Sequence, residues 1–185
     1  MIGDNQKKFL DFEKLTKPNE ELKRIAKSLC GKTKRETAIN ILNFLKKTLR
    51  YVDLERKDPK RWKKLFRKRS ARQILKTKIS YGCGETATLF VALCRLCNIP
   101  AKFVEGKRLK KSGGHSWARI WLDNRWVDVD LTKGKEGINF DPEKAKHGPY
   151  IVLSESLGPS DSAITCYQDW RRIEKSWNYR KKKSS

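Results

Sequence analysis

Apolar side chains in the N-terminal part of the chain recur at the three- and four-residue spacing of amphipathic helices. Residues 19–30 (NEELKRIAKSLC) begin with an asparagine that suits a helix N-cap. Residues 33–52 (TKRETAINILNFLKKTLRYV) have Thr33 and Glu36 in the spacing of a capping box. A shorter helix is predicted over residues 5–15. The two longer segments each show one apolar face, formed by Leu22, Ile25, Ala26 and Leu29 and by Ala38, Ile41, Leu42, Leu45 and Leu49.

The pattern changes in the middle of the chain. Residues 84–97 are apolar nearly all round, which indicates a buried helix. Residues 100–106 (PAKFVEG) read as a strand, and the alternation over 115–131 predicts two strands around a tight turn. Residues 149–154 (PYIVLS) read as a further strand. The predicted fold is therefore α+β, with N-terminal helices packed on an antiparallel sheet and the apolar helix at their junction.

The most basic internal segment is residues 53–69 (DLERKDPKRWKKLFRKR). Trp62, Leu65 and Phe66 lie at helical spacing within it. Two interpretations remain open: a solvated helix that packs its apolar stripe on the domain, or an anion-binding face. The C-terminal stretch RRIEKSWNYRKKKSS is also basic, and we expect its end to be frayed.

Composition adds charge and compartment to this picture. The chain has 185 residues and a formal net charge of +23, which attracts polyanions such as nucleic acid or an anionic surface. The N-terminus is charged and lacks the apolar region of a secretory signal, and no apolar run is long enough to span a bilayer. The five cysteines are an odd number with irregular spacing, which favours reduced thiols in a cytoplasmic protein. A protein released by lysis would have the same composition.

Cys83 lies between Gly82 and Gly84, directly before the apolar helix. A helix N-terminus carries partial positive charge, which favours the thiolate, and its free N–H groups suit an oxyanion. A cysteine in a glycine turn is more often structural than catalytic. The chemistry therefore depends on a base elsewhere in the chain.

The chain has two histidines, His115 and His147. His115 opens a predicted strand after a glycine pair, which makes it the better candidate. A two-residue turn at Asp123-Asn124 would make Asp130 the diagonal neighbour of His115, with Cβ atoms about 5–7 Å apart. A carboxylate there would accept a hydrogen bond from the imidazole and fix its tautomer. This expectation requires a turn of two residues, or a loop with another even number of residues.

These residues together resemble the transglutaminase-like core of the papain-like cysteine hydrolases. The segments YGCGETATLFVALCRLCNIPAKFVEG and GGHSWARIWLDNRWVDVDLT contain its motifs. The matching positions are Cys83, Ile99, Pro100, Ala101, Lys102, His115, Trp117, Trp126, Asp130 and Thr132. By this resemblance Cys83 would be the nucleophile, His115 the general base and acid, and Asp130 the orienting carboxylate. The Cys-Gly-Glu triplet also resembles the peptide N-glycanase branch of the superfamily.

Three weaker candidates accompany this constellation. Gln73 and Gly84 are considered for the oxyanion hole. Trp117, with two further tryptophans of the same strand face, would either line an acyl-binding cleft or fill the core. Cys94 and Cys97 form a C-x-x-C inside a buried helix, for which core packing is the default over a metal site.

The expected activity is thiol-dependent acyl transfer from an amide through a Cys-His-Asp triad, with no cofactor or metal. The substrate would be a peptide, an isopeptide or a glutamine-bearing protein. A protein-glutamine transglutaminase is one alternative, and a non-enzymatic nucleic-acid-binding module is another. Polyanions would bind through Arg56–Arg69 and the basic tail. We expect a helical part over 1–69, a catalytic core over 70–160 and a basic extension over 161–185.

Overall fold

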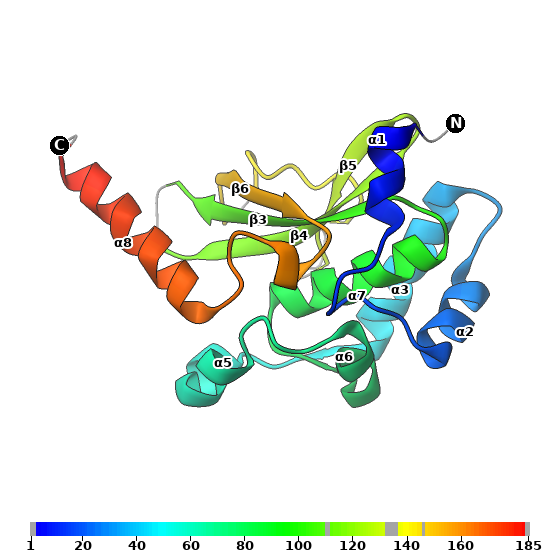
Figure 1. Cartoon of the computed structure of the whole chain (residues 1–185), viewed down its shortest axis with the longest axis horizontal. Coiled ribbons are helices and arrows are strands. Elements are labelled where there is room, and N and C mark those ends of the chain that lie inside the picture. Colours follow the sequence, from blue (N-terminus) through cyan, green and yellow to red (C-terminus); the bar gives the residue numbers. More distant parts are fainter. Residues whose placement is uncertain (1–2, 110–111, 132–136, 146, 184–185) are drawn as a thin grey trace.

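Helices cover one face of a four-stranded antiparallel sheet in the computed structural model (Figure 1). The structure describes residues 3–109, 112–131, 137–145 and 147–183. Its helices are α1 (Asp4–Lys7), α2 (Glu20–Leu29), α3 (Lys34–Thr48), α4 (Leu54–Lys57), α5 (Pro59–Leu65), α6 (Ala71–Thr77), α7 (Cys83–Leu96) and α8 (Tyr167–Lys183), with 3-10 turns η1 (Lys8–Leu10) and η2 (Pro159–Asp161). The strands are β1 (Arg50–Tyr51), β2 (Ile79–Ser80), β3 (Ala101–Arg108), β4 (Gly114–Leu122), β5 (Arg125–Val129) and β6 (Tyr150–Ser156).

The two long N-terminal helices begin at the predicted caps. The Asn19 side chain accepts a hydrogen bond from the Leu22 N–H at 3.0 Å, and the Thr33 hydroxyl accepts one from the Glu36 N–H at 3.1 Å. Each cap satisfies a backbone donor that the first helical turn leaves without a partner, which stabilises the helix by about 1 kcal/mol. Both helices therefore begin as predicted, and α2 also ends close to its predicted end, but α3 ends at Thr48 and the last residues of its predicted range include strand β1 (Arg50–Tyr51).

Helix α7 forms the centre of the main core. Leu89, Phe90 and Leu93 are fully buried, and each contributes about 1.5–3 kcal/mol of burial free energy. This cluster joins α7 to α2, α3 and α6 and to one face of the sheet, where Ala118 and Ile120 project. The all-round apolar sequence of α7 is explained by contact with helices on one side and strands on the other.

The sheet has the strand order β5-β4-β3-β6. Strands β4 and β5 pair Leu122 with Arg125 and Arg119 with Asp128, as the two-residue turn predicts. Asp123 and Asn124 adopt φ values of 50° and 60°, the left-handed conformations of a hairpin turn that matches strand twist. The predicted partner of His115 across the hairpin, Thr132, lies outside the described residues.

Both ends of the chain differ from expectation. The helix predicted over residues 5–15 is divided into α1 and η1, and η1 ends at Leu10. The basic C-terminal stretch, for which no helix was predicted, contributes to α8 (Tyr167–Lys183), which projects beside the sheet (Figure 1). No helix in the described ranges is long and apolar enough to cross a membrane.

Candidate active site

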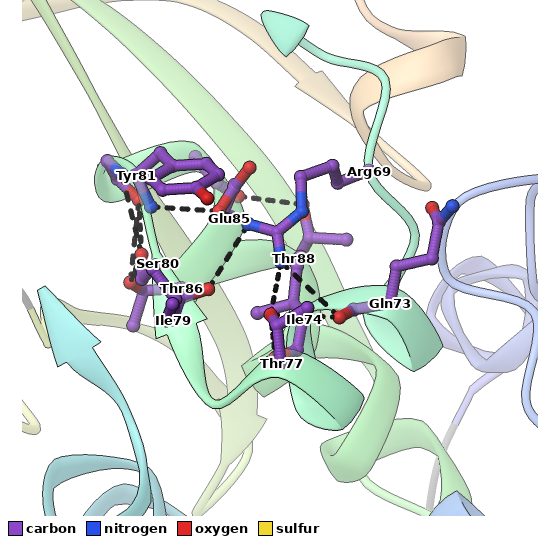
Figure 2. A network of polar contacts seen from close by, with 12 residues as sticks. Arg69, Gln73, Ile74, Thr77, Ile79, Ser80, Tyr81, Glu85, Thr86 and Thr88 are labelled. Carbon is purple, nitrogen blue, oxygen red and sulfur yellow. Dashed lines mark hydrogen bonds and ion pairs between the residues drawn. The ribbon is translucent and has the colours of Figure 1, made fainter. Parts of the chain in front are cut away.

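Cys83 is the first residue of α7, and a polar network fixes the turn that precedes it (Figure 2). The Arg69 guanidinium donates to Glu85 Oε2 at 2.6 Å and to the Ile79 carbonyl at 3.2 Å. The same Glu85 oxygen accepts the Tyr81 N–H at 2.9 Å. Because Glu85 lies on the first turn of α7, these bonds tie the incoming chain to the helix that carries the sulfur.

His115 and Asp130 meet as the hairpin register predicts. The His115 Nε2 lies 2.7 Å from Asp130 Oδ2, and both side chains are more than nine-tenths buried. The bond to Asp130 occupies Nε2 and leaves Nδ1 for Cys83, whose thiol hydrogen bonds with the His115 side chain. The structure therefore brings all three predicted residues together, in the order thiol, imidazole, carboxylate.

Opposing effects set the ionisation of the thiol. Burial raises the pKa of Cys83, and the charge and hydrogen bond of His115, the charge of Arg67 and a backbone hydrogen bond from Ser116 lower it to about 7. For His115, burial lowers the pKa, and the Cys83 thiolate and Asp130 raise it to about 10. Between these two values the pair exists as thiolate and imidazolium, which is the reactive form of a cysteine nucleophile.

Aromatic rings hold the imidazole in place. The His115 ring stacks on Trp117 at 6.0 Å between centroids and lies 5.3 Å from Tyr150 and 6.1 Å from Phe140. Trp117 is itself fully buried and donates its indole N–H to Asp128 at 2.8 Å. These contacts leave the ring little freedom to turn away from Asp130.

A cavity of about 270 Å³ opens beside Cys83 and His115. Four aromatic residues contribute to its wall: Trp62, Phe66, Tyr167 and Trp170. Edge-to-face contacts link Trp62 with Phe66 and Phe66 with Tyr167, with centroids 5.4 and 6.1 Å apart. Helices α5 and α8 therefore form one aromatic side of the cleft, and this shape suits an extended or side-chain amide.

Charged residues line the same cavity as buried ion pairs. Arg67 pairs with Glu105 at 2.5 Å, and Arg69 pairs with Glu85 at 2.6 Å. Arg108 also contributes to the lining. The cleft is therefore polar at the nucleophile and aromatic toward α5 and α8.

Several secondary candidates lie elsewhere or differ in role. Gln73 is exposed and accepts the Ser70 N–H at 2.9 Å in a capping box, so its position does not support an oxyanion role. Trp117 packs in the core away from the cleft, on the sheet face opposite α7. Gly84 lines the cavity, and the Arg67 guanidinium occupies the space that a Cβ atom at this position would need.

The other histidine and the C-x-x-C cysteines are outside the cleft. His147 is exposed and does not contribute to the described lining. Cys94 is fully buried in the main core, and Cys97 approaches Cys30. In the described ranges, no cluster of three or more histidine, cysteine or acidic side chains is arranged to hold a metal ion.

Sequence reasoning missed Arg67 and the contribution of α8. Arg67 is one of many arginines and lysines in a basic stretch, and nothing in its spacing marks it. The apolar triplet of Trp62, Leu65 and Phe66 was a usable signal, because all three residues line the cavity and do not fill the core. Trp170 gave no signal, since its helix is largely polar.

Comparison with known proteins identifies the family. The sequence model of the transglutaminase-like superfamily matches residues 23–131, more than half of the chain, so the chain belongs to this superfamily. Among curated proteins no match was found.

Among the similar solved structures, one shares the fold at low sequence identity. A candidate cysteine protease from Cytophaga hutchinsonii has a TM-score of 0.56 and 17% identity, covering 83% of this chain and 55% of that protein. A protein described as a TGase has a TM-score of 0.47 and 13% identity, covering 77% of this chain and 36% of that one. A candidate protease from Parabacteroides distasonis has a TM-score of 0.46 and 13% identity, covering 74% and 31%. This chain thus spans only about half, or less, of the length of these structures.

The link between Asp130 and the thiol can be tested through pH. Asp130→Asn removes a negative charge that raises the His115 pKa, so the imidazolium becomes less stable and the pKa of the Cys83 thiol rises by about one unit. Alkylation of the Cys83 peptide by iodoacetamide, followed by mass spectrometry across pH, measures this midpoint. We expect the wild-type midpoint near pH 7. Asp123→Asn, a matched change at the exposed turn of the same hairpin, is the control, and equal shifts in both variants would contradict the link.

Proposed function

We propose that this protein is a cysteine hydrolase that cleaves amide bonds through Cys83, His115 and Asp130. The observation that carries the proposal is the relay from the thiol to the buried imidazole and carboxylate, with the thiol and the imidazole lining a cleft. Membership of the transglutaminase-like superfamily supports the same class of chemistry. The substrate is a peptide, an isopeptide or a side-chain amide of a protein.

The proposed reaction gives each of these groups one task. The Cys83 thiolate attacks the amide carbonyl carbon, and backbone N–H groups at the start of α7 stabilise the negative charge on the oxygen. The carbon–nitrogen bond breaks as the His115 imidazolium gives its proton to the leaving amine. Water then attacks the thioester carbonyl while His115 takes its proton. The carboxylic acid departs and the thiolate–imidazolium pair is restored.

Asp130 acts through His115. Its carboxylate fixes which imidazole nitrogen faces the sulfur and stabilises the positive ring while the thiolate is present. Because the carboxylate is itself buried, its charge is screened little by water, and its effect on the ring is strong.

Transfer to an amine in place of water would make the protein a transglutaminase. Both reactions share the thioester, so the groups around Cys83 do not distinguish them. The aromatic side of the cleft, which includes Trp62 and Trp170, would accept the aliphatic stem of a lysine as well as the remainder of a peptide. We propose hydrolysis as the main reaction, because the opening to solvent admits water to the thioester.

An activity-based thiol probe tests the nucleophile and base together. Cys83→Ala should abolish labelling, and His115→Ala should slow it at least about 100-fold, as expected for loss of a general base. The four remaining cysteines are present in both variants and act as the internal control. Labelling of Cys83→Ala at the wild-type rate would exclude the mechanism. In parallel, a glutamine-bearing protein is incubated with a labelled primary amine, and incorporation of the label at a rate above ammonia release would favour the transglutaminase.

A second role, binding of a nucleic acid strand, is favoured by a cationic groove between α5 and α8. The groove has a volume of about 480 Å³ and is lined by Lys63, Tyr167, Gln168, Arg171, Arg172 and Lys175. Tyr167 also lines the catalytic cavity, so the two recesses adjoin. We propose that phosphates of a single strand bind these cations and that Tyr167 offers a ring for base stacking.

Salt dependence tests this role. Binding of a fluorescent oligonucleotide should weaken steeply as salt increases, and Arg172→Ser with Lys175→Ser should reduce the slope of log affinity against log salt by about one to two. Removal of two cations that are also exposed, Lys23 and Lys27 on α2, provides the matched control. Binding that is absent at low salt, or equally affected by both pairs, would refute the role. Cys83→Ala should leave binding unchanged.

A further inference from the structure

The guanidinium of Arg67 lies against the start of the nucleophile helix. Arg67 follows α5 and adopts a φ of 57°, a left-handed conformation that is rare for a residue with a long side chain. Its Nη2 donates to Glu105 Oε1 at 2.5 Å and to Ser116 Oγ at 2.8 Å, and its side chain is 10% exposed. A strained backbone and a buried cation together indicate a specific role for this side chain.

Two aromatic rings hold the cation from its sides. The guanidinium carbon lies 4.9 Å from the ring centroid of Phe66 and 4.9 Å from that of Phe103. Cation–π contacts of this kind strengthen when water is excluded. The guanidinium is thus fixed on several sides, so its charge has a defined position relative to the helix end.

Gly84 permits this close approach. A Cβ atom built at position 84 would overlap Arg67 Nη1, so only glycine leaves room for the guanidinium there. Position 84 directly follows the nucleophile. The close contact therefore places a fixed positive charge one residue from Cys83.

Ser116 connects the cation with the sulfur. Its hydroxyl accepts from Arg67, while its backbone N–H hydrogen bonds with the Cys83 thiol. Ser116 is also the register partner of Glu105 across β3 and β4. Ser116 thus contacts Arg67, pairs with Glu105 across the strands and bonds the Cys83 thiol.

We propose that Arg67 is a positioning residue for Cys83, whose guanidinium, held by Glu105 and admitted by Gly84, stabilises the thiolate. The assignment rests on the proposed function, since it concerns the same sulfur. It adds a second cation beside the His115 imidazolium.

Because Arg67 and Glu105 carry opposite charges, their removal should shift the Cys83 pKa in opposite directions. Removing Arg67 takes away a positive charge and leaves Glu105 facing the thiolate, so the Cys83 pKa rises. Removing the Glu105 charge leaves Arg67 without its counter-ion, so the Cys83 pKa falls. A merely structural pair would give shifts of one sign, because either loss would disturb the same packing.

Several other ionisable groups lie near the Cys83 sulfur. The groups that face this region from neighbouring elements are Tyr51, Glu55, Lys68, Arg69, Glu85, Arg108, His115, Asp130 and Tyr150. Arg69 is paired with Glu85, and Asp130 acts through His115. Each of these groups is retained in every variant below, so their contributions are constant.

The experiment measures the pH midpoint of alkylation at the Cys83 peptide. Arg67→Met should raise the midpoint by about one unit, and Glu105→Gln should lower it. Gly84→Ala should raise the midpoint as Arg67→Met does, because the added Cβ displaces the guanidinium. The double variant Gly84→Ala/Arg67→Met should show no larger shift than Arg67→Met alone, because both changes remove the same cation. Arg67→Lys should restore part of the shift.

Arg119→Met is the matched control, since Arg119 forms ion pairs with Asp128 and Glu155 away from the cleft. Its midpoint should match that of wild type. Circular dichroism and the thermal midpoint establish that each variant is folded. Shifts of equal sign for Arg67→Met and Glu105→Gln, or no shift in either, would overturn the assignment. The alkylation midpoint can be measured without a substrate. A wild-type protein that cleaves no amide would therefore count against the proposed function, while the alkylation midpoints would still test the role of Arg67.

A second inference concerns two cysteines far from the cleft. Cys30 follows α2 and Cys97 follows α7, and their sulfur atoms lie 3.0 Å apart. This separation is about 1 Å longer than a disulfide bond of ~2.05 Å. Both thiols also contact the Ala26 carbonyl at 3.3 Å. Cys30 is exposed, so oxidants in solution can reach the pair.

We also propose that Cys30 and Cys97 are a disulfide-forming pair that a peroxide oxidises. The Cys30 sulfur attacks one peroxide oxygen, and the oxygen–oxygen bond breaks to give a sulfenic acid and water. The Cys97 sulfur then attacks the sulfenic sulfur, and a second water departs. Two thiols lose two electrons and two protons, and one hydrogen peroxide becomes two waters. The bond would tie the ends of α2 and α7 across 67 positions of sequence.

Thiol titration and peptide mapping test this pair in wild type and in Cys83→Ala. Stoichiometric hydrogen peroxide should remove two titratable thiols from Cys83→Ala, yield one cross-linked peptide with Cys30 and Cys97, and raise the thermal midpoint by several degrees. Dithiothreitol should reverse all three effects. Cys30→Ser and Cys97→Ser should abolish the rise, whereas Cys166→Ser should keep it. An unchanged thiol count, or cross-links between other cysteines, would overturn the inference.

Discussion

The site depends on a half-buried thiol that lies beside a buried imidazole. Burial alone disfavours the thiolate, and the opposite charge of His115 must more than compensate before Cys83 ionises near neutral pH. The thiolate and the imidazolium each lower the free energy needed to ionise the other, so each group loses its charge when its partner is moved away. The fold must therefore bring a helix end and a strand end to one point and hold them there. The long apolar helix α7, packed between helices and sheet, supplies one end, and the start of β4 supplies the other.

The second requirement is that the imidazole keeps its orientation. A two-residue turn between β4 and β5 sets the parity of the hairpin, so His115 and Asp130 project on the same face. Trp117 fills the adjacent position on that face and stacks on the imidazole. The aromatic face lies away from α7, so the sheet separates a packing face from a face that orients the base. The two faces meet at the start of β4, which is where the thiol and the imidazole come together.

Local sequence patterns were sufficient to predict the long N-terminal helices and the hairpin register. Caps and periodicity located α2 and α3, and the Asp123-Asn124 turn fixed the register that joins His115 with Asp130. Contacts between distant segments were not predictable in this way. Gln73 has the residue type of an oxyanion group, but its local capping bond with Ser70 satisfies it elsewhere. Arg67 is indistinguishable from its basic neighbours until β3 supplies Glu105, and the contribution of α8 to the cleft appears only when its aromatic residues meet those of α5.

The large positive charge of the chain and the tuning of the thiol are separate effects. Cations on the surface are screened within about 8–10 Å in physiological salt, so their excess does little to the ionisation of a buried sulfur. Inside the cleft, Arg67 and Arg69 each have a carboxylate partner, which cancels most of their long-range field. A paired guanidinium still acts on a group that lies nearer to it than to its partner. The position of a cation relative to Cys83, rather than the net charge of +23, therefore decides its effect on the chemistry.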